Sequence, residues 1–96
     1  MKFEWDENKN NKNVEKHHID FEEASEIFED GDRINYPDDR KNYGEKRWIT
    51  IGTVLEFIYT VVYTIRRDAI RMISARRANR KEREWYNNRL NKKGNE

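Results

Sequence analysis

The chain has 96 residues, enough for one small domain, and Val, Ile, Leu and Phe supply only 19 of them, so its core must be thin. It has no Cys, which excludes disulfide bonds, thiolate zinc sites and cysteine nucleophiles, and its most apolar run, residues 57–63, is too short to span a bilayer. Charged residues make up 41% of the chain, yet the formal net charge is only +1, so the total charge does not predict a partner.

The N-terminal part predicts a short strand and two helices. Residues 3–5 alternate apolar and charged side chains, and Asp6 can cap a helix that runs to about Lys16. Asp20 and Glu23 have the spacing of a capping box, which predicts a second, amphipathic helix ending at Asp30. The first helix is only weakly apolar, and its expected inward stripe is Asn10, Asn13, Val14 and His17.

The remainder of the chain predicts four strands and a last helix. Residues 33–36 form a short strand that ends at Pro37, and an exposed loop follows. Segments 47–54, 56–65 and 69–75 are rich in β-branched and aromatic residues, which is typical of an antiparallel meander. Apolar residues lie on both faces of the middle segment, which is therefore the expected central strand. A capping box then opens the last helix, whose docking residues are Trp85, Tyr86 and Leu90.

The predicted fold is α+β with the order β-α-α-β-β-β-β-α and a mostly antiparallel sheet. We expect the helices to pack on one face, leaving the other face for a ligand. A single domain should span residues 1–90, and residues 91–96 should form a frayed tail. The N-terminus lacks the apolar core of a signal peptide, so a soluble, cytoplasmic protein without membrane contact is expected.

The small net charge conceals an uneven distribution. Residues 1–46 carry 8 basic and 14 acidic side chains, whereas residues 47–96 carry 12 basic and 5 acidic ones. Eight cations fall within residues 66–83, and most are Arg, which suits bidentate contact with phosphate. The alternative is a solvated charged face whose arginines pair with nearby acidic residues such as Glu82 and Glu84.

Two positions favour the phosphate hypothesis. Arg71 lies inside an apolar strand, where a charge needs water or an anion. Arg76 and Arg77 lie where a strand gives way to a helix, so their side chains and the helix N-terminus could converge on one phosphate.

The pair His17 and His18 is the second candidate, because histidine exchanges protons near neutral pH. Alternatively, one histidine caps or packs against the first helix and the other is solvated. Neighbouring helical side chains point about 100° apart, which makes the pair a poor chelate, and we predict no metal and no cofactor. The chain has no Gly-rich phosphate loop and no Ser-centred elbow, so nucleotide hydrolysis and proteolysis are not expected.

Several sequence blocks form a recognisable series. The chain opens with FEWDENKNNKNVEKHHIDFEEASEIFED, which contains F-x-W-D, K-H and F-E-E-A elements, and RWITIG, VVYT and IRMISARRANRKEREWY follow. In their order and spacing, these blocks resemble the BrnT toxins of bacterial type II toxin-antitoxin operons. The resemblance implies a RelE-like fold and RNA cleavage that blocks translation. It also implies a BrnA antitoxin with a ribbon-helix-helix domain, through which the complex would contact operator DNA.

The resemblance assigns residues to the site. Lys16 and His17 match the K-H element, Arg66 follows Y-T, and residues 74–76 match S-A-R. Arg80, Arg83 and Tyr86 fall in the basic and aromatic ending. Three positions depart from the pattern: His18 and Arg67 stand where Gly is usual or common, and Ile65 where Glu is common.

The leading hypothesis is a metal-independent ribonuclease in which the ribose 2′-OH attacks the adjacent phosphate. His17, supported by Lys16, would transfer protons, and Arg66, Arg71 and Arg76 would contact the phosphate. Flanking RNA would be bound by Arg77, Arg80, Arg83 and Tyr86. The alternative is a non-catalytic basic module that binds nucleic acid or an acidic protein; a DNA-binding regulator is disfavoured because no helix-turn-helix is recognisable. We expect an antitoxin segment to cover the Arg-rich face.

Overall fold

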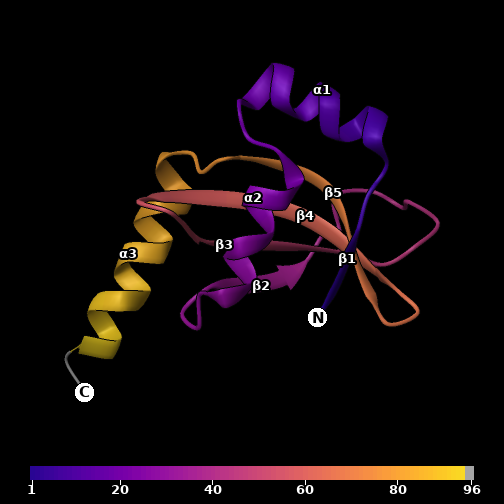
Figure 1. Ribbon diagram of the computed structural model, residues 1–96. Coiled ribbons are helices and arrows are strands. Elements are labelled where there is room, and N and C mark those ends of the chain that lie inside the picture. The colour runs from indigo at the N-terminus through magenta and orange to yellow at the C-terminus, as the bar shows by residue number, and fades with distance from the viewer. Residues whose placement is uncertain (95–96) are drawn as a thin grey trace.

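A computed structural model describes residues 1–94 of the chain as a five-stranded sheet with the strand order β1-β5-β4-β3-β2 and helices on both sides (Figure 1). The predicted fold class, the order of the elements and the central position of β4 are confirmed. The elements are β1 (Lys2–Glu4), α1 (Glu7–His17), α2 (Phe21–Ala24), the 3₁₀ helix η1 (Ser25–Glu29), β2 (Ile34–Pro37), β3 (Arg47–Val54), β4 (Phe57–Arg66), β5 (Ala69–Arg77) and α3 (Arg80–Gly94).

Strand β5 has two different neighbours along its outer edge. Its first three residues pair in parallel with β1, and α1 lies along the rest. There the buried amide of Asn13 replaces a strand: its Nδ2 donates to the Ala75 carbonyl at 2.9 Å, and its Oδ1 accepts from the Ala75 N–H at 3.0 Å. Nδ2 also donates to the Ile19 carbonyl at 3.0 Å. Asn13 therefore fixes α1, and the residues that follow on it, against β5. Val14, which was expected to face inward with Asn13, is 40% exposed, so this part of the prediction is wrong.

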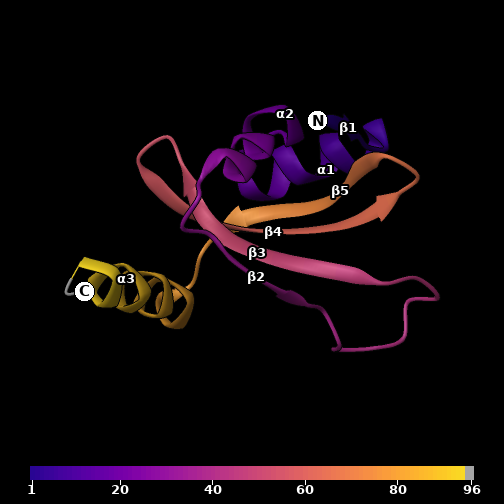
Figure 2. The ribbon, with the colours of Figure 1, turned by 90° about the horizontal axis from the view of Figure 1, so that it is seen from below.

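The helices cover both faces of the sheet, so the expectation that all helices pack on one face is wrong. Helix α2 and η1 bury Phe21 and Ile27 in a cluster that includes Val61. Helix α3 buries Tyr86 in a second cluster that includes Val62. Successive strand residues point to opposite faces, which places α3 across the sheet from α2. Figure 2 shows α3 below the sheet and the N-terminal helices above it.

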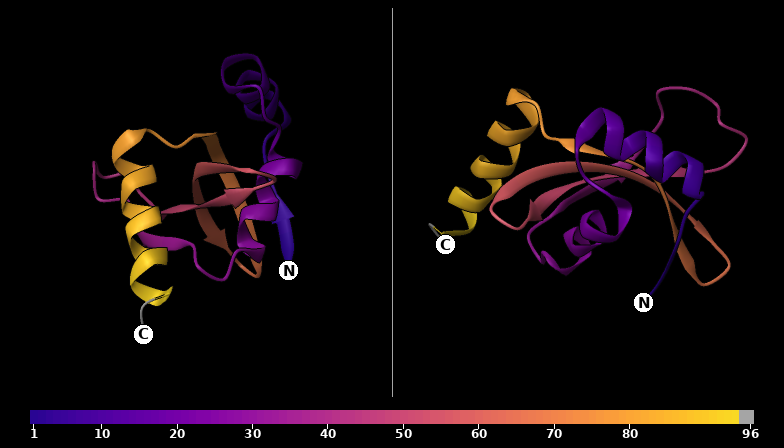
Figure 3. Two further views of the ribbon diagram at one scale, coloured as in Figure 1. Left: turned by 90° about the vertical axis from the view of Figure 1, so that its left-hand side faces the viewer. Right: turned by 45° about the horizontal axis from the view of Figure 1, so that its top comes forward.

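Helix α3 is anchored by its contacts with the turn that follows η1. The Tyr86 hydroxyl donates to Asp30 Oδ2 at 2.5 Å, and the same oxygen accepts from the N–H of Thr53 at 2.9 Å. Near the other end of the helix, Lys93 Nζ lies 2.7 Å from Asp32 Oδ1. The helix continues to Gly94, four residues past the expected end of the domain (Figure 3, left). Residues 95–96 of the expected frayed tail lie outside the described residues.

Two of the departures from the BrnT pattern fall at left-handed backbone positions. His18, which follows α1, has φ 60°, and Arg67, in the turn between β4 and β5, has φ 56°. Glycine adopts this conformation without the clash that a Cβ introduces, which is the physical reason to expect it at both positions.

Replacing His18 by Gly is expected to raise the free energy of unfolding by about 1 kcal/mol, because it removes the clash of the left-handed conformation. Urea unfolding would measure the change. His18→Ala is the matched control, since Ala keeps the Cβ and should give no such gain. A stability equal to or below that of the wild type for His18→Gly would contradict the backbone argument.

Candidate nucleic-acid interface

A row of lysines lines the side of α1 that faces the β5 edge. Lys9, Lys12 and Lys16 are spaced three and four residues apart, which places them on one side of a helix. With Asn13 and His17 of α1 and Ile73 and Ser74 of β5 they line an open hollow of about 310 Å³. Ile73 also contacts the cluster under α3, so the hollow opens toward the face of the sheet on which α3 lies. This arrangement concentrates positive charge beside a histidine.

Arg76 extends this basic surface from α1 toward α3. It pairs with Thr60 in the neighbouring strand and directly follows Ala75, which belongs to the α2 cluster, so its side chain points to the α3 face. Its Nη1 and Nη2 donate to the two carboxylate oxygens of Glu82 at 2.7 and 2.9 Å. With a side chain that is 36% exposed, Arg76 remains accessible to an anion.

Glu82 connects Arg76 with the start of α3. It accepts a hydrogen bond from the N–H of Asn79 at 2.8 Å, and its own N–H donates to Asn79 Oδ1 at 2.9 Å, which is the capping box expected from the sequence. Burial raises the pKa of Glu82, but the hydrogen bonds from Arg76 and Asn79 outweigh it, and the pKa lies below its ordinary value. Glu82 is therefore ionised at neutral pH and holds the Arg76 guanidinium in one orientation.

The electrostatic surroundings of His17 keep it neutral. Burial lowers the pKa of His17 below its ordinary value of 6.5, and the positive charges of Lys16 and Arg76 lower it further. A neutral imidazole can accept a proton at neutral pH. The fold thus brings together three of the predicted residues, Lys16, His17 and Arg76, although they come from α1 and from β5.

Tyr36 of β2 lies on the same face of the sheet, at the edge strand opposite to α1. It shares a cross-strand row with Ile49, Val62 and Ser74, and Ser74 lines the hollow beside His17. Burial raises the pKa of Tyr36 and the charge of Glu82 raises it further, whereas Arg40 and Arg76 lower it; the net shift is upward from 10.0. The hydroxyl therefore carries its proton at neutral pH.

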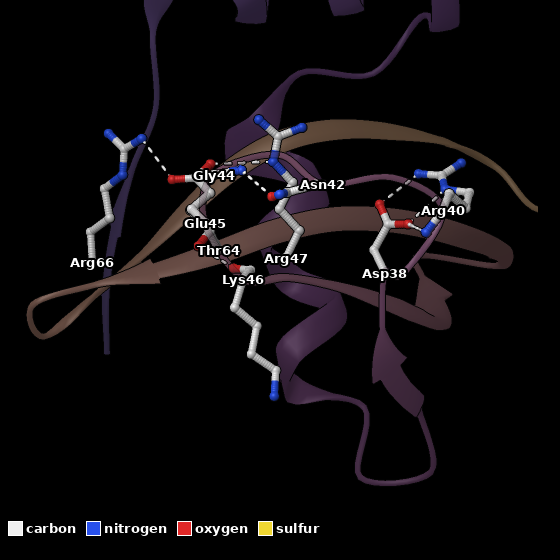
Figure 4. Close-up of polar contacts among 9 residues, drawn as sticks. All are labelled: Asp38, Arg40, Asn42, Gly44, Glu45, Lys46, Arg47, Thr64 and Arg66. Carbon is white, nitrogen blue, oxygen red and sulfur yellow. Dashed lines mark hydrogen bonds and ion pairs between the residues drawn. The ribbon is translucent and has the colours of Figure 1, made fainter.

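The structure does not bring Arg66 and Arg71 to Arg76. Arg66 Nη2 lies 3.0 Å from Glu45 Oε1 at the β4–β5 hairpin (Figure 4), about 20 Å along β4 from the pairing position of Arg76. Arg71 Nη1 lies 2.7 Å from Glu4 Oε2. Glu4 is the cross-strand neighbour of Arg71, so a structural partner accounts for the charge within this strand. The three arginines expected at one phosphate occupy three separate ion pairs.

Arg77 and Tyr86 also differ from expectation. Arg77 follows Arg76 in β5 and points to the opposite face, where its guanidinium lies 3.9 Å from the ring centroid of Phe57; the two arginines do not converge. Tyr86 is 3% exposed and belongs to the core, so an RNA base cannot stack on it. Arg80 is exposed and paired with Glu84, and Arg83 donates to the Ala78 carbonyl at 2.7 Å.

Sequence reasoning missed several residues of this surface. Lys9 and Lys12 lie in the N-terminal half of the chain, whose net charge is negative, so the charge balance did not indicate a basic surface there. Their helical spacing with Lys16 is the sequence signal that identifies the row. Tyr36 could not be found, because its place depends on the register of β2 with β3.

Asp38 and Arg40, in the loop that follows β2, form a further ion pair in which the guanidinium binds both carboxylate oxygens, at 2.7 and 2.8 Å (Figure 4). This pair holds the pKa of Asp38 at about 2.

Within residues 1–94, His, Asp and Glu do not form a group of three or more that could hold a metal ion. None of the helices described there is long and apolar enough to cross a membrane.

The fold and this surface define a small α+β protein with a cationic sheet face beside a neutral histidine. Residues 5–82 match the family of BrnT, the ribonuclease toxin of type II toxin-antitoxin systems, and the chain belongs to this family. It is accordingly a ribonuclease toxin whose partner is an antitoxin. A comparison with curated proteins found no match.

Proposed function

We propose that the chain is a metal-independent endoribonuclease that inhibits translation by cleaving RNA. The 2′-oxygen of a ribose forms a bond to the adjacent phosphorus while the bond from phosphorus to the 5′-oxygen breaks. The products are a 2′,3′-cyclic phosphate and a 5′-hydroxyl. The observation that carries this proposal is the neutral His17 on α1 close to Arg76 on β5, since the reaction needs a base and a cation at one phosphate.

Each role follows from the surroundings of the residue. His17 takes the 2′-hydroxyl proton, and Lys16 supports it by keeping the imidazole neutral. Arg76, oriented by Glu82, stabilises the additional negative charge of the transition state. Tyr36 lies on the same face of the sheet as Arg76, whose charge acts on it, and it retains its proton, so it can protonate the leaving 5′-oxygen. Arg66, Arg71, Arg77 and Tyr86 have no role in this proposal.

The lysine row of α1 binds the RNA backbone that flanks the scissile phosphate, and the exposed Arg80 and Arg83 at the start of α3 extend this contact. A BrnA-type antitoxin neutralises the toxin by covering this surface, because burying the cations blocks RNA without unfolding the protein. Contact with operator DNA occurs through the antitoxin. The cytoplasm, where translation takes place, is the proposed location.

Cleavage should depend on pH through His17. The base is active only when neutral, so the rate should fall as the pH drops through the pKa of His17, which lies below 6.5, and should stay level above it until Tyr36, whose pKa is raised from 10.0, loses its proton. His17→Ala should remove this limb and lower the rate by about 100-fold or more. A pH profile of single-turnover cleavage provides the measurement, and an unchanged acidic limb in His17→Ala would assign the proton transfer to another group.

The proposed reaction is tested with purified toxin and RNA in the presence of a chelator. Discrete fragments with 2′,3′-cyclic phosphate ends are expected. Fragments with 3′-hydroxyl ends would reject attack by the 2′-oxygen, and a requirement for a divalent cation would reject metal independence. Binding without any turnover would favour the non-catalytic module instead.

A further inference from the structure

Helix α3 presents a stripe to solvent that is aromatic and basic beyond Glu82. Glu82, Trp85, Arg89 and Lys92 are spaced three, four and three residues apart and so follow one side of the helix. Trp85 is 48% exposed, whereas the neighbouring Tyr86 is buried and anchors α3. Within residues 1–94, neither Arg89 nor Lys92 forms a salt bridge. The outer part of the stripe borders an open hollow of about 320 Å³ lined by Trp85, Asn88, Arg89, Lys92 and Lys93.

The position of Trp85 connects this stripe with the proposed cleavage site. Its ring contacts Tyr36, with 5.3 Å between the ring centroids, and Tyr36 is the proposed acid. One helical turn toward the start of α3, about 4.5 Å along the axis, lies Glu82, which holds Arg76. A nucleotide whose phosphate lies at Arg76 therefore has an exposed indole within reach of its base.

We propose that Trp85 is a stacking platform for one base of single-stranded RNA, at a nucleotide next to the scissile phosphate. Arg89 and Lys92 contact the phosphates that follow. An exposed aromatic ring with cations beside it is the combination with which proteins bind single-stranded nucleic acid. Trp85 lies beyond residues 5–82, so the family match does not assign it a role. This inference rests on the proposed function, because it places the base relative to Arg76.

The test uses the full-length toxin and a 12-nucleotide RNA with 2′-fluoro groups, which lack the attacking hydroxyl and cannot be cleaved. Trp85→Ala is expected to bind this RNA about 5- to 100-fold more weakly, and Trp85→Phe should retain most of the affinity. A thermal melt of Trp85→Ala accompanies the binding measurement, because the substitution also removes the packing of the indole on Tyr36. In a Trp5→Phe, Trp48→Phe protein, RNA should quench the fluorescence of the one remaining indole.

Oligonucleotides with a single abasic position identify the stacked base. One abasic position should weaken binding to the wild type but not to Trp85→Ala, because removing the base and removing the indole abolish the same stacking contact. The platform would be overturned if Trp85→Ala bound the RNA as tightly as the wild type. It would also be overturned if every abasic position weakened binding to Trp85→Ala as much as to the wild type. Loss of antitoxin binding with unchanged RNA affinity would also overturn it and assign Trp85 to the protein partner. A wild type that does not bind the RNA would reject the proposed function itself.

Discussion

Replacing Arg76 by Ala is expected to lower the rate of RNA cleavage by about 100- to 1000-fold, the usual cost of removing one group that stabilises a transition-state charge. Arg76 is the arginine that lies near His17, and its guanidinium is held in one orientation by Glu82. The measurement is single-turnover cleavage with protein in excess. Arg76→Ala should also relieve growth arrest when the toxin is expressed without its antitoxin.

The neighbouring arginine provides the matched control. Arg77 has the same charge and adjoins Arg76, but it points to the opposite face of the sheet and packs on Phe57. Arg77→Ala should therefore cleave RNA at close to the wild-type rate. A thermal melt must accompany the comparison, because Arg76→Ala leaves the mostly buried Glu82 side chain without its partner. Equal losses in the two variants would contradict a site on the α3 face.

Replacing Asn13 by Ala is expected to lower the free energy of unfolding by about 3 kcal/mol, since the Ala75 N–H, the Ala75 carbonyl and the Ile19 carbonyl all lose their partner in a buried place. Helix α1 should loosen from β5, and the lysine row and His17 with it, so cleavage should fall although Asn13 touches no RNA. Urea unfolding measures the first effect and single-turnover cleavage the second.

Asn11→Ala is the matched control for Asn13, because Asn11 lies on the same helix and is exposed. It should change stability by less than about 0.5 kcal/mol. If Asn13→Ala is as stable as Asn11→Ala, the amide is not what holds α1 against the sheet edge.

Local patterns predicted most of the fold because they depend on neighbouring residues. The caps at Asp6, Asp20 and Asn79 could be identified from spacing alone, and side chains at all three accept the expected hydrogen bonds. The side of the sheet on which α3 packs could not be identified in this way. A signal was nevertheless present: Val61 and Val62 are adjacent and both apolar, and in a strand this requires cover on both faces.

The site was harder to predict, because it depends on which side chains share a face. Arg66, Arg71 and Arg76 are close in sequence but separate in the structure, where strand register and carboxylate partners set their positions. Lys16 and His17 lie on another element, α1, which the Asn13 contact with Ala75 holds against β5 near Arg76. Charge density along the chain predicted an anion-binding surface, but it also included Arg77, which points to the face opposite Arg76.

The central claim is that the 2′-hydroxyl of the RNA attacks at the surface formed by His17 and Arg76. It is tested most directly by mapping the cleavage site in an RNA oligonucleotide and replacing the ribose on its 5′ side by deoxyribose. Wild-type toxin is predicted to leave the substituted bond intact while it still binds the oligonucleotide with similar affinity. Cleavage of the deoxyribose-containing bond at the rate of the all-ribose RNA would contradict the account.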